Sequence, residues 1–218
     1  MARKLTNGTV PAIGATFGTT TAITGTTNEN PAVATFAAGH GLVTGEYVEI
    51  VSHDWPQLVG RVFRTSVSTN AVTLVGLDAS NATLYPAGGT GTGRRIITWA
   101  NIQQVNADGI TVDGGEQQFL EGQYIDSNLQ FRIPTLKTAI NAAMVVDDDQ
   151  SLTYWTTVRA AEVAQTNYPI RLQYPGGGGF AVGTGIWTVS AAPAISGNNV
   201  QKRTIGCALA SLFTEYTS

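Results

Sequence analysis

Short runs of β-forming residues, each ended by glycine, asparagine or proline, recur along this 218-residue sequence. In the first part they are regularly spaced, and one of them alternates Val72 and Leu74 with more polar neighbours. Short strands at even spacing, with turn residues between them, are typical of a small barrel or sandwich. The strands expected in this part cover residues 32–37, 47–51, 61–67 and 71–77.

The second part repeats the β pattern around one expected helix. Residues 151–165 lack Gly and Pro and place Leu152, Trp155 and Val158 at helical spacing. Asp149 or Ser151 is the expected N-cap, because both side chains accept hydrogen bonds from free backbone N–H groups at a helix start. Strands are expected over residues 96–105, 110–112, 136–146, 170–174, 180–191 and 200–213.

A glycine-rich stretch, residues 87–93, contains no large side chain and is predicted to be a linker. It separates a small all-β module, residues 23–93, from a larger β domain, residues 94–218. Residues 1–22 are expected to form an N-terminal arm or first strand. The predicted fold class is therefore mainly β, with one flanking helix on the larger domain.

Charge is scarce. Charged residues make up 12% of the chain, against roughly 25% in typical soluble domains. Such a composition favours contacts between copies of the chain, because interface cores are depleted in charge; a Thr-rich monomer is the alternative. Residues 96–218 hold ten acidic and six basic residues, a net charge of −4. Tight DNA binding is therefore disfavoured, since it needs basic side chains against phosphates. A surface past which DNA slides without being held is compatible with this charge.

Residues that carry chemistry are few. His40 and His53 have no spacing to a serine and a carboxylate that indicates a catalytic triad. The single cysteine, Cys207, forms no internal disulfide, and no Cys or His cluster has metal-ligand spacing. The acidic run at residues 147–149 lacks the glycine and terminal glutamate of a calcium loop. We expect no enzymatic activity, no cofactor and no metal.

The N-terminal residues lack the apolar core of a signal peptide. No stretch approaches the roughly 20 apolar residues needed to span a bilayer as a helix. Synthesis in the cytoplasm, without insertion into a membrane, is expected.

Two blocks of sequence resemble known phage proteins. Residues 23–33 (ITGTTNENPAV), followed by GHGL at 39–42, TGE at 44–46, GRVF at 60–63 and YPAGGT at 85–90, are similar to a small β-module that recurs in phage structural proteins. Residues 114–119 (GGEQQF) and 130–137 (QFRIPTLK), with the acidic pair at 148–149 leading to Trp155, resemble the tail tube proteins of phages with long, non-contractile tails.

The second resemblance implies a tail-tube β-sandwich or barrel that assembles into stacked hexameric rings in the virion. It implies inner strands joined between subunits, a lumen for the ejection of double-stranded DNA, and contacts with the tape-measure, tail-tip and terminator proteins. The small module is then expected to decorate the outside of the tube.

Two sets of residues follow from this expectation. The lumen or inter-subunit strand is expected to present one face of residues 136–146, or of its partner near residues 200–212. That face consists of Lys137, Ala139, Asn141, Ala143 and Val145. The segment that reaches a neighbouring ring or subunit is expected within residues 104–129, at Glu116, Gln117, Gln118, Phe119, Glu121 and Tyr124.

In an alternative function, the small module is the binding part of the protein. The chain is then a surface-exposed phage protein that binds host carbohydrate through Trp55 and Tyr85, since aromatic rings stack on sugars. The aromatic residues around the expected helix, Tyr154, Trp155 and Tyr168, are better explained by packing in a core or an interface.

Overall fold

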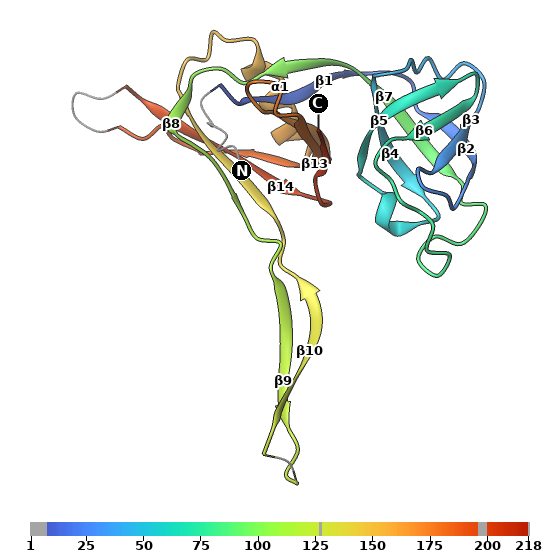
Figure 1. Ribbon diagram of the computed structural model, residues 1–218. Coiled ribbons are helices and arrows are strands. Elements are labelled where there is room, and N and C mark those ends of the chain that lie inside the picture. Colours follow the sequence, from blue (N-terminus) through green and yellow to red (C-terminus); the bar gives the residue numbers. More distant parts are fainter. Residues whose placement is uncertain (1–7, 127, 196–199, 218) are drawn as a thin grey trace.

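The computed structural model describes residues 8–126, 128–195 and 200–217. Strands dominate them, and they contain one α-helix, α1 (Tyr154–Ala164), and one short 3-10 helix, η1 (Pro56–Leu58). Figure 1 shows three parts: a small barrel, a larger body that carries α1, and a long hairpin that projects away from the body. The expected mainly β fold with one α-helix is confirmed.

The strands divide among these three parts, and one strand is shared. The barrel contains β2 (Thr21–Thr26), β3 (Val33–Phe36), β4 (Tyr47–His53), β5 (Val62–Ser68), β6 (Ala71–Leu74) and the first half of β7 (Gly91–Asn101). The body contains β1 (Val10–Phe17), β8 (Val105–Asp113), β11 (Asn141–Asp147), β12 (Tyr168–Gln173), β13 (Phe180–Val189), β14 (Lys202–Leu209) and β15 (Thr214–Tyr216). The hairpin consists of β9 (Gln117–Gln123) and β10 (Gln130–Lys137).

The barrel closes because β2, at one end of the order β2-β3-β6-β5-β4-β7, also pairs with β7. Closure leaves no sheet edge within it. Alternate residues of its strands point inward, and Phe36, Ile50, Val72 and Leu74 are buried there together with Trp55. Period-two alternation in the sequence is thus the direct cause of this core.

The predicted linker at residues 87–93 is wrong for residues 91–93, because β7 already begins at Gly91, whereas residues 87–90 belong to no strand. A side chain at Gly91 would overlap the carbonyl oxygen of Ser52, and one at Gly93 would come within 3.0 Å of the Phe36 ring. These glycines are needed for the close approach of β7 to β4 and to the barrel core.

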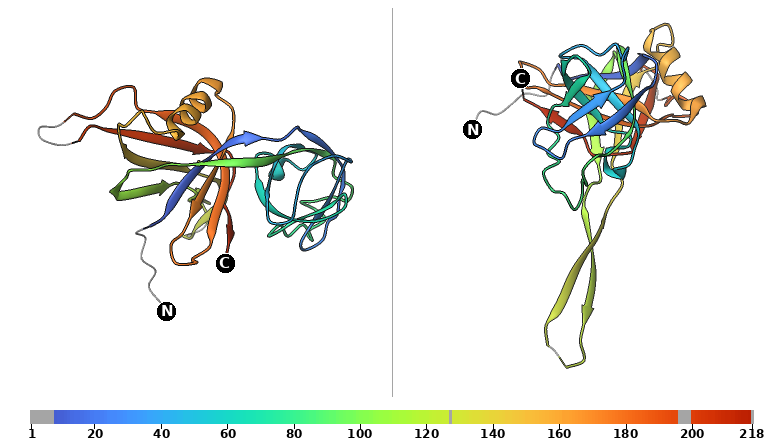
Figure 2. Two further views of the ribbon diagram at one scale, coloured as in Figure 1. Left: turned by 90° about the horizontal axis from the view of Figure 1, so that it is seen from above. Right: turned by 90° about the vertical axis from the view of Figure 1, so that its right-hand side faces the viewer.

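The barrel and the body are joined by β7, which pairs with β4 through its first half and with β1 through its second half. Side chains from both parts also pack against each other where the barrel meets the body. The Tyr47 ring makes edge contacts with Trp99 and Phe180, at centroid distances of 5.5 and 5.6 Å. From β15, the Tyr216 hydroxyl accepts a hydrogen bond from the Arg64 N–H at 2.8 Å and donates one to the Val75 carbonyl at 2.9 Å. Figure 2 shows the barrel beside the body.

The body is a curved sheet in the order β1-β12-β13-β14-β11-β8. Strand β13 pairs with β12 through residues 180–185 and with β14 through residues 185–189, so it links two regions of the sheet. One face of the sheet packs around Met144, Trp155, Ile170 and Trp187, with α1 contributing to the same core. Tyr154 and Trp155 are buried, which agrees with a packing role for the aromatic residues of the helix.

The helix begins three residues later than expected, and the predicted cap is wrong. Thr153 is the N-cap residue and makes no side-chain capping hydrogen bond. Asp149 Oδ1 instead accepts hydrogen bonds from the N–H and the hydroxyl of Ser151, at 3.1 and 2.6 Å. This local turn competes with a helical start at residue 151. The helix ends at Ala164, and its C-cap residue Gln165 has a left-handed φ of 49°.

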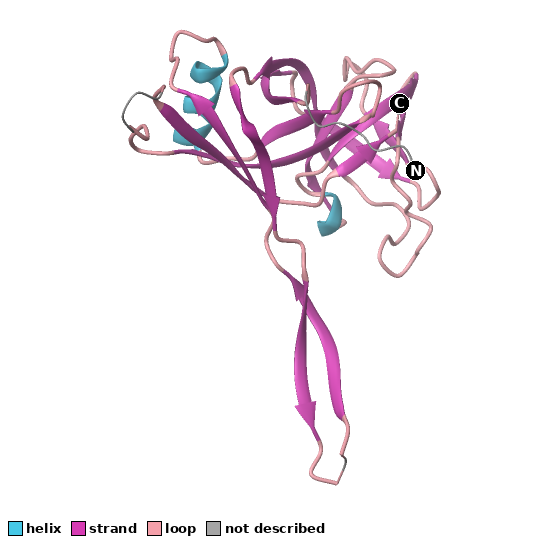
Figure 3. Cartoon of the chain, turned by 60° about the vertical axis from the view of Figure 1, so that its left-hand side comes forward, coloured by secondary structure: helices cyan, strands magenta, loops and turns pink. Residues whose placement is uncertain are grey.

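The expected single strand over residues 136–146 is also interrupted. Residues 138–140 belong to no strand; β10 ends before them and β11 begins after them. At this point the chain leaves the hairpin and enters the body, where a side chain at Gly114 would overlap the Ala139 carbonyl. Figure 3 shows the hairpin as a separate two-stranded ribbon that extends well beyond the body.

Candidate assembly surfaces

Neither histidine lies in a catalytic arrangement. His53 Nδ1 accepts a hydrogen bond from the Trp55 N–H at 3.0 Å, and its Nε2 lies 3.0 Å from the Thr26 hydroxyl. His40 Nδ1 likewise accepts from the Leu42 N–H at 3.0 Å. Both rings therefore hold loops of the barrel, and burial lowers the pKa of His53.

The proposed sugar platform of the small module is not available at Trp55. The Trp55 side chain is 2% exposed and its indole N–H donates to the Pro86 carbonyl at 2.9 Å. Tyr85 packs against it at a centroid distance of 5.2 Å. A ring that is covered in this way cannot stack on a sugar, so Trp55 does not serve the carbohydrate-binding alternative as expected.

Acidic groups do not gather into a metal site. Within the described residues, no group of three or more His, Cys, Asp and Glu side chains is placed to hold a metal ion. In the acidic run, Asp148 forms a buried ion pair with Arg203 at 2.8 Å. The described residues also contain no helix that is long and apolar enough to cross a membrane.

The face of the body sheet that points away from the core is uncovered. Along β11 the buried residues Ala142, Met144 and Val146 alternate with Asn141, Ala143 and Val145, which are less buried. Ladder partners carry this alternation across the neighbouring strands. We call this surface the open face; it consists of Thr111, Asp113, Asn141, Ala143, Val145, Asp147, Ile186, Thr188, Lys202, Thr204, Gly206 and Ala208.

The open face carries little charge. Most of its side chains are small, and its ionisable residues are Asp113, Asp147 and Lys202. Asp147 lies directly opposite Lys202 in the β11–β14 ladder. The residual charge of this face is therefore slightly negative, so it offers no array of basic groups to hold a polyanion.

Two stretches of strand edge border this face. The strand β8 ends the sheet order, and no strand of the described chain pairs with its outer side. On β13, pairing with β12 stops at Gly185, so residues 186–189 have a described strand neighbour only on the β14 side. Part of this second edge is covered by α1, because the Val189 N–H donates to Glu162 Oε1 at 3.0 Å. Exposed strand edges are sites where another chain can pair.

The hairpin has two chemically different faces. In an antiparallel pair, residues directly opposite each other lie on the same face. Leu120 is opposite Ile133, and Phe131 lies across Gly122 and stacks on Tyr124 at a centroid distance of 4.9 Å. We call these four side chains the apolar strip; they are Leu120, Tyr124, Phe131 and Ile133.

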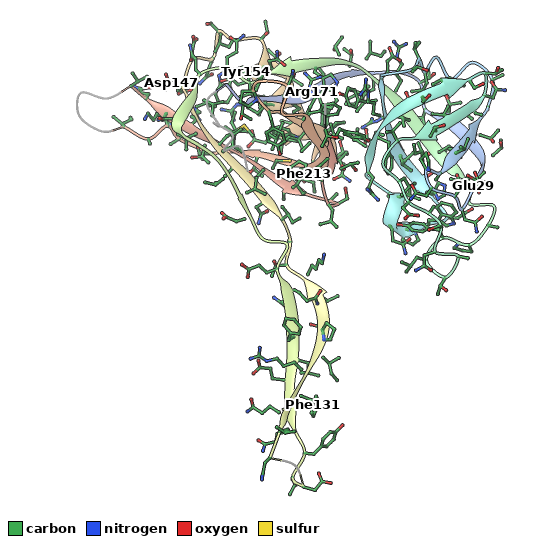
Figure 4. All side chains as sticks on the ribbon, in the orientation of Figure 1. Glu29, Phe131, Asp147, Tyr154, Arg171 and Phe213 are labelled. Carbon is green, nitrogen blue, oxygen red and sulfur yellow. The ribbon has the colours of Figure 1, made fainter. Side chains whose placement is uncertain are left out.

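The opposite face of the hairpin is polar towards the tip and apolar nearer the body. It carries an exposed ion pair between Glu121 and Arg132, at 2.7 Å, and the glutamine pair Gln123 and Gln130, while Phe119 lies opposite Pro134 on the same face. Figure 4 shows side chains on both sides of the projecting ribbon, with Phe131 labelled towards its tip. A two-stranded hairpin is marginally stable by itself in water, and an apolar strip of this length needs a covering surface.

The structure separates residues that the sequence grouped together. Asn141, Ala143 and Val145 lie on the open face, whereas Lys137 ends β10 of the hairpin and Ala139 lies in the connection between them. Of the residues expected to reach a neighbour, Gln117, Gln118, Phe119 and Glu121 lie on β9, with Glu116 just before it and Tyr124 just after it.

Sequence reasoning missed both strands of the hairpin, β9 and nearly all of β10, and with them the apolar strip. Ile133 and Phe131 were part of a family motif, but their pairing with Leu120 and Gly122 was not foreseen. The signal that was available is the alternation of Phe131 and Ile133 with Arg132, which places the two apolar residues on one face of a strand.

In a comparison with protein families, a family model described as "Phage tail tube protein, TTP" matches residues 53–218, about three-quarters of the chain. The match starts at the end of β4, so it includes part of the barrel and all of the body from β7 onwards. No curated protein matches the sequence.

Proposed function

The chain belongs to the phage tail tube protein family, and from this we propose that its copies join into hexameric rings, which stack into the conduit for double-stranded DNA ejection. As a member of this family it is a structural component of the virion tail. The chain would be synthesised in the cytoplasm of the host.

The observation that carries the proposal is a sheet with one packed face, one open face and an edge on each side. If β8 of one copy lies beside residues 186–189 of the next, the four strands β8, β11, β14 and β13 continue into the neighbour. Repetition of this head-to-tail contact closes a ring. Joining the strands also satisfies backbone groups that an edge leaves exposed.

In such a ring the open face lines the lumen. Asn141, Ala143 and Val145 would then meet the passing DNA, with Ala139 and Lys137 at the end where the hairpin leaves the body. Small uncharged side chains and a slight negative charge suit passage, because phosphates find few basic groups to hold them. The same lumen would hold the tape-measure protein before ejection.

The hairpin is the proposed contact between rings. It extends away from the body, and its residues Glu116, Gln117, Gln118, Phe119, Glu121 and Tyr124 would lie against a copy in the adjacent ring. The exposure of Leu120 and Ile133, at 59% and 50%, supports this role, since both need a covering surface. At the ends of the tube, tail-tip and terminator proteins would meet the same surfaces.

A proline at position 112 tests the ring contact. The Leu209 N–H donates to the Ile140 carbonyl at 2.8 Å, so even-numbered residues of β11 bond to β14 and odd-numbered ones bond to β8. Ala143 therefore bonds with Thr111, and Val112 points its N–H to the outer edge. Val112→Pro removes that outer donor and preserves the β8–β11 ladder.

We expect Val112→Pro to fold like the wild type, by circular dichroism and thermal melting, and to form no rings in electron micrographs. Val112→Thr, which keeps the N–H, is the matched control and should assemble. Rings of normal appearance formed by Val112→Pro would refute the proposed edge contact.

A further inference from the structure

A cleft of about 510 Å³ lies between the barrel and the body. The barrel contributes Val51 and Val59, each 40% exposed, and the body contributes Ile186, which is 41% exposed. Three partly exposed aliphatic side chains thus meet across one opening. Single exposed aliphatic residues are normal on a surface, but a converging group indicates a contact site.

The walls of this cleft are fixed. The Thr184 hydroxyl donates a hydrogen bond to the Gly60 carbonyl, which ties β13 to the barrel. Arg94 Nε donates to Glu49 Oε2 at 2.7 Å, and its Nη2 donates to the Asn167 carbonyl of the body at 3.4 Å. The barrel therefore cannot swing to fill the opening without breaking these bonds.

The chemistry of the cleft suits an uncharged protein segment. Glu49 and Arg94 are the charged residues that line it, and they neutralise each other as an ion pair. Burial raises the pKa of Glu49, with Arg94 opposing this shift. A small charged ligand would find no unbalanced partner there.

Ile186 connects this cleft with the ring contact. It lines the cleft, and it is also the first residue of the β13 edge that has no described strand neighbour on its outer side, residues 186–189, of which α1 covers the Val189 end. The segment of β8 that pairs continuously with β11 is residues 110–113, which matches that edge in length. Its first three residues, Ile110, Thr111 and Val112, are uncharged, and Val112 is 47% exposed; Asp113, at its end, is the one charged residue of the segment.

We propose that the cleft receives strand β8 of a neighbouring copy, so that the barrel forms one wall of the joint between subunits. This inference rests on the proposed ring assembly. It gives the barrel a role in the side-to-side contact, beyond the decoration of the tube that the sequence resemblance implies. Val51 and Val59 then pack against the exposed side chains of the incoming strand.

Cross-linking tests this contact. The chain carrying both Val59→Cys and Val112→Cys is assembled and treated with a short bis-maleimide. Cys207 is 1% exposed, so it contributes little background. Because the contact is head-to-tail, the product should be a ladder of dimers, trimers and higher species on a denaturing gel.

The matched control is Val43→Cys with Val112→Cys. Val43 is 57% exposed on the same barrel but does not line the cleft. We expect at least a tenfold lower yield of cross-linked ladder from this pair. A second variant, Val59→Glu, should raise the protein concentration needed for assembly at least tenfold, and Val43→Glu should leave it unchanged.

Rings that form normally but give no ladder with the 59/112 pair, and that tolerate Val59→Glu, would overturn the inference and leave the ring proposal standing. Failure of the wild-type chain to form rings under any condition would overturn both.

Discussion

Truncation of Leu120 is the sharpest test of the hairpin contact. Leu120 is 59% exposed and lies on a two-stranded sheet that is separate from both cores. Leu120→Ala removes three carbon groups, each worth about 0.8 kcal/mol when fully buried. Scaled by the exposed fraction, complete burial against a neighbouring copy corresponds to a loss of about 1.4 kcal/mol per contact, or about tenfold in the association constant.

The assay is the critical concentration for tube formation, measured by light scattering over a dilution series. We expect a rise of about tenfold for Leu120→Ala, with an unchanged melting temperature of the unassembled protein. Gln123→Ala, on the polar face of the same strand, is the matched control and should change the critical concentration little. The reasoning is refuted if the two variants assemble equally well, or if the glutamine variant is the weaker one.

Three further predictions concern stability. Tyr216→Phe removes the hydroxyl that bonds the Arg64 N–H, and we expect a loss of about 1–3 kcal/mol in unfolding free energy, measured by urea denaturation. Arg203→Met leaves Asp148 as an unpaired buried carboxylate and should cost about 3–5 kcal/mol in the same assay. Burial lowers the pKa of His53 below its ordinary value of 6.5. The contribution of the neutral ring to the free energy of unfolding is therefore complete above pH 6.5 and is lost as the pH falls through the lowered pKa. His53→Gln should reduce the dependence of that free energy on pH in this acid range, measured by the same urea denaturation.

The strands of the barrel were predictable because their side chains have only two environments. Val72 and Leu74 point into a closed core, their neighbours point outward, and the sequence alternates accordingly. The body sheet is harder, since β13 contains a run of five buried residues, 181–185, where it passes between two regions of the sheet. Periodicity alone does not describe a strand that is covered on both faces.

The glycines between residues 87 and 93 led to the wrong prediction of a linker, because a sequence does not reveal which atoms lie beside the backbone in the fold. Gly91 and Gly93 occur in a strand that approaches Ser52 and Phe36 too closely for side chains. The same composition in an unpacked segment would indeed be a linker. The prediction of a sugar-binding Trp55 failed for a related reason. Its position between strands gave no indication that the Pro86 carbonyl and Tyr85 cover it.

The hairpin was only half predictable because no core of the described chain packs against it. Its apolar residues alternate as in a buried strand, yet Leu120 and Ile133 are exposed in the isolated subunit. Sequence resemblance pointed to contact residues near Phe119 and Tyr124. It did not reveal which face of the ribbon is apolar, which requires the register between Leu120 and Ile133.

Electron microscopy of the purified protein over a concentration series, with light scattering on the same samples, tests the central claim most directly. The account predicts hollow rings and stacked tubes whose subunits repeat head-to-tail around a lumen. A compact, closed oligomer without a lumen at every concentration, such as a trimer, would contradict it.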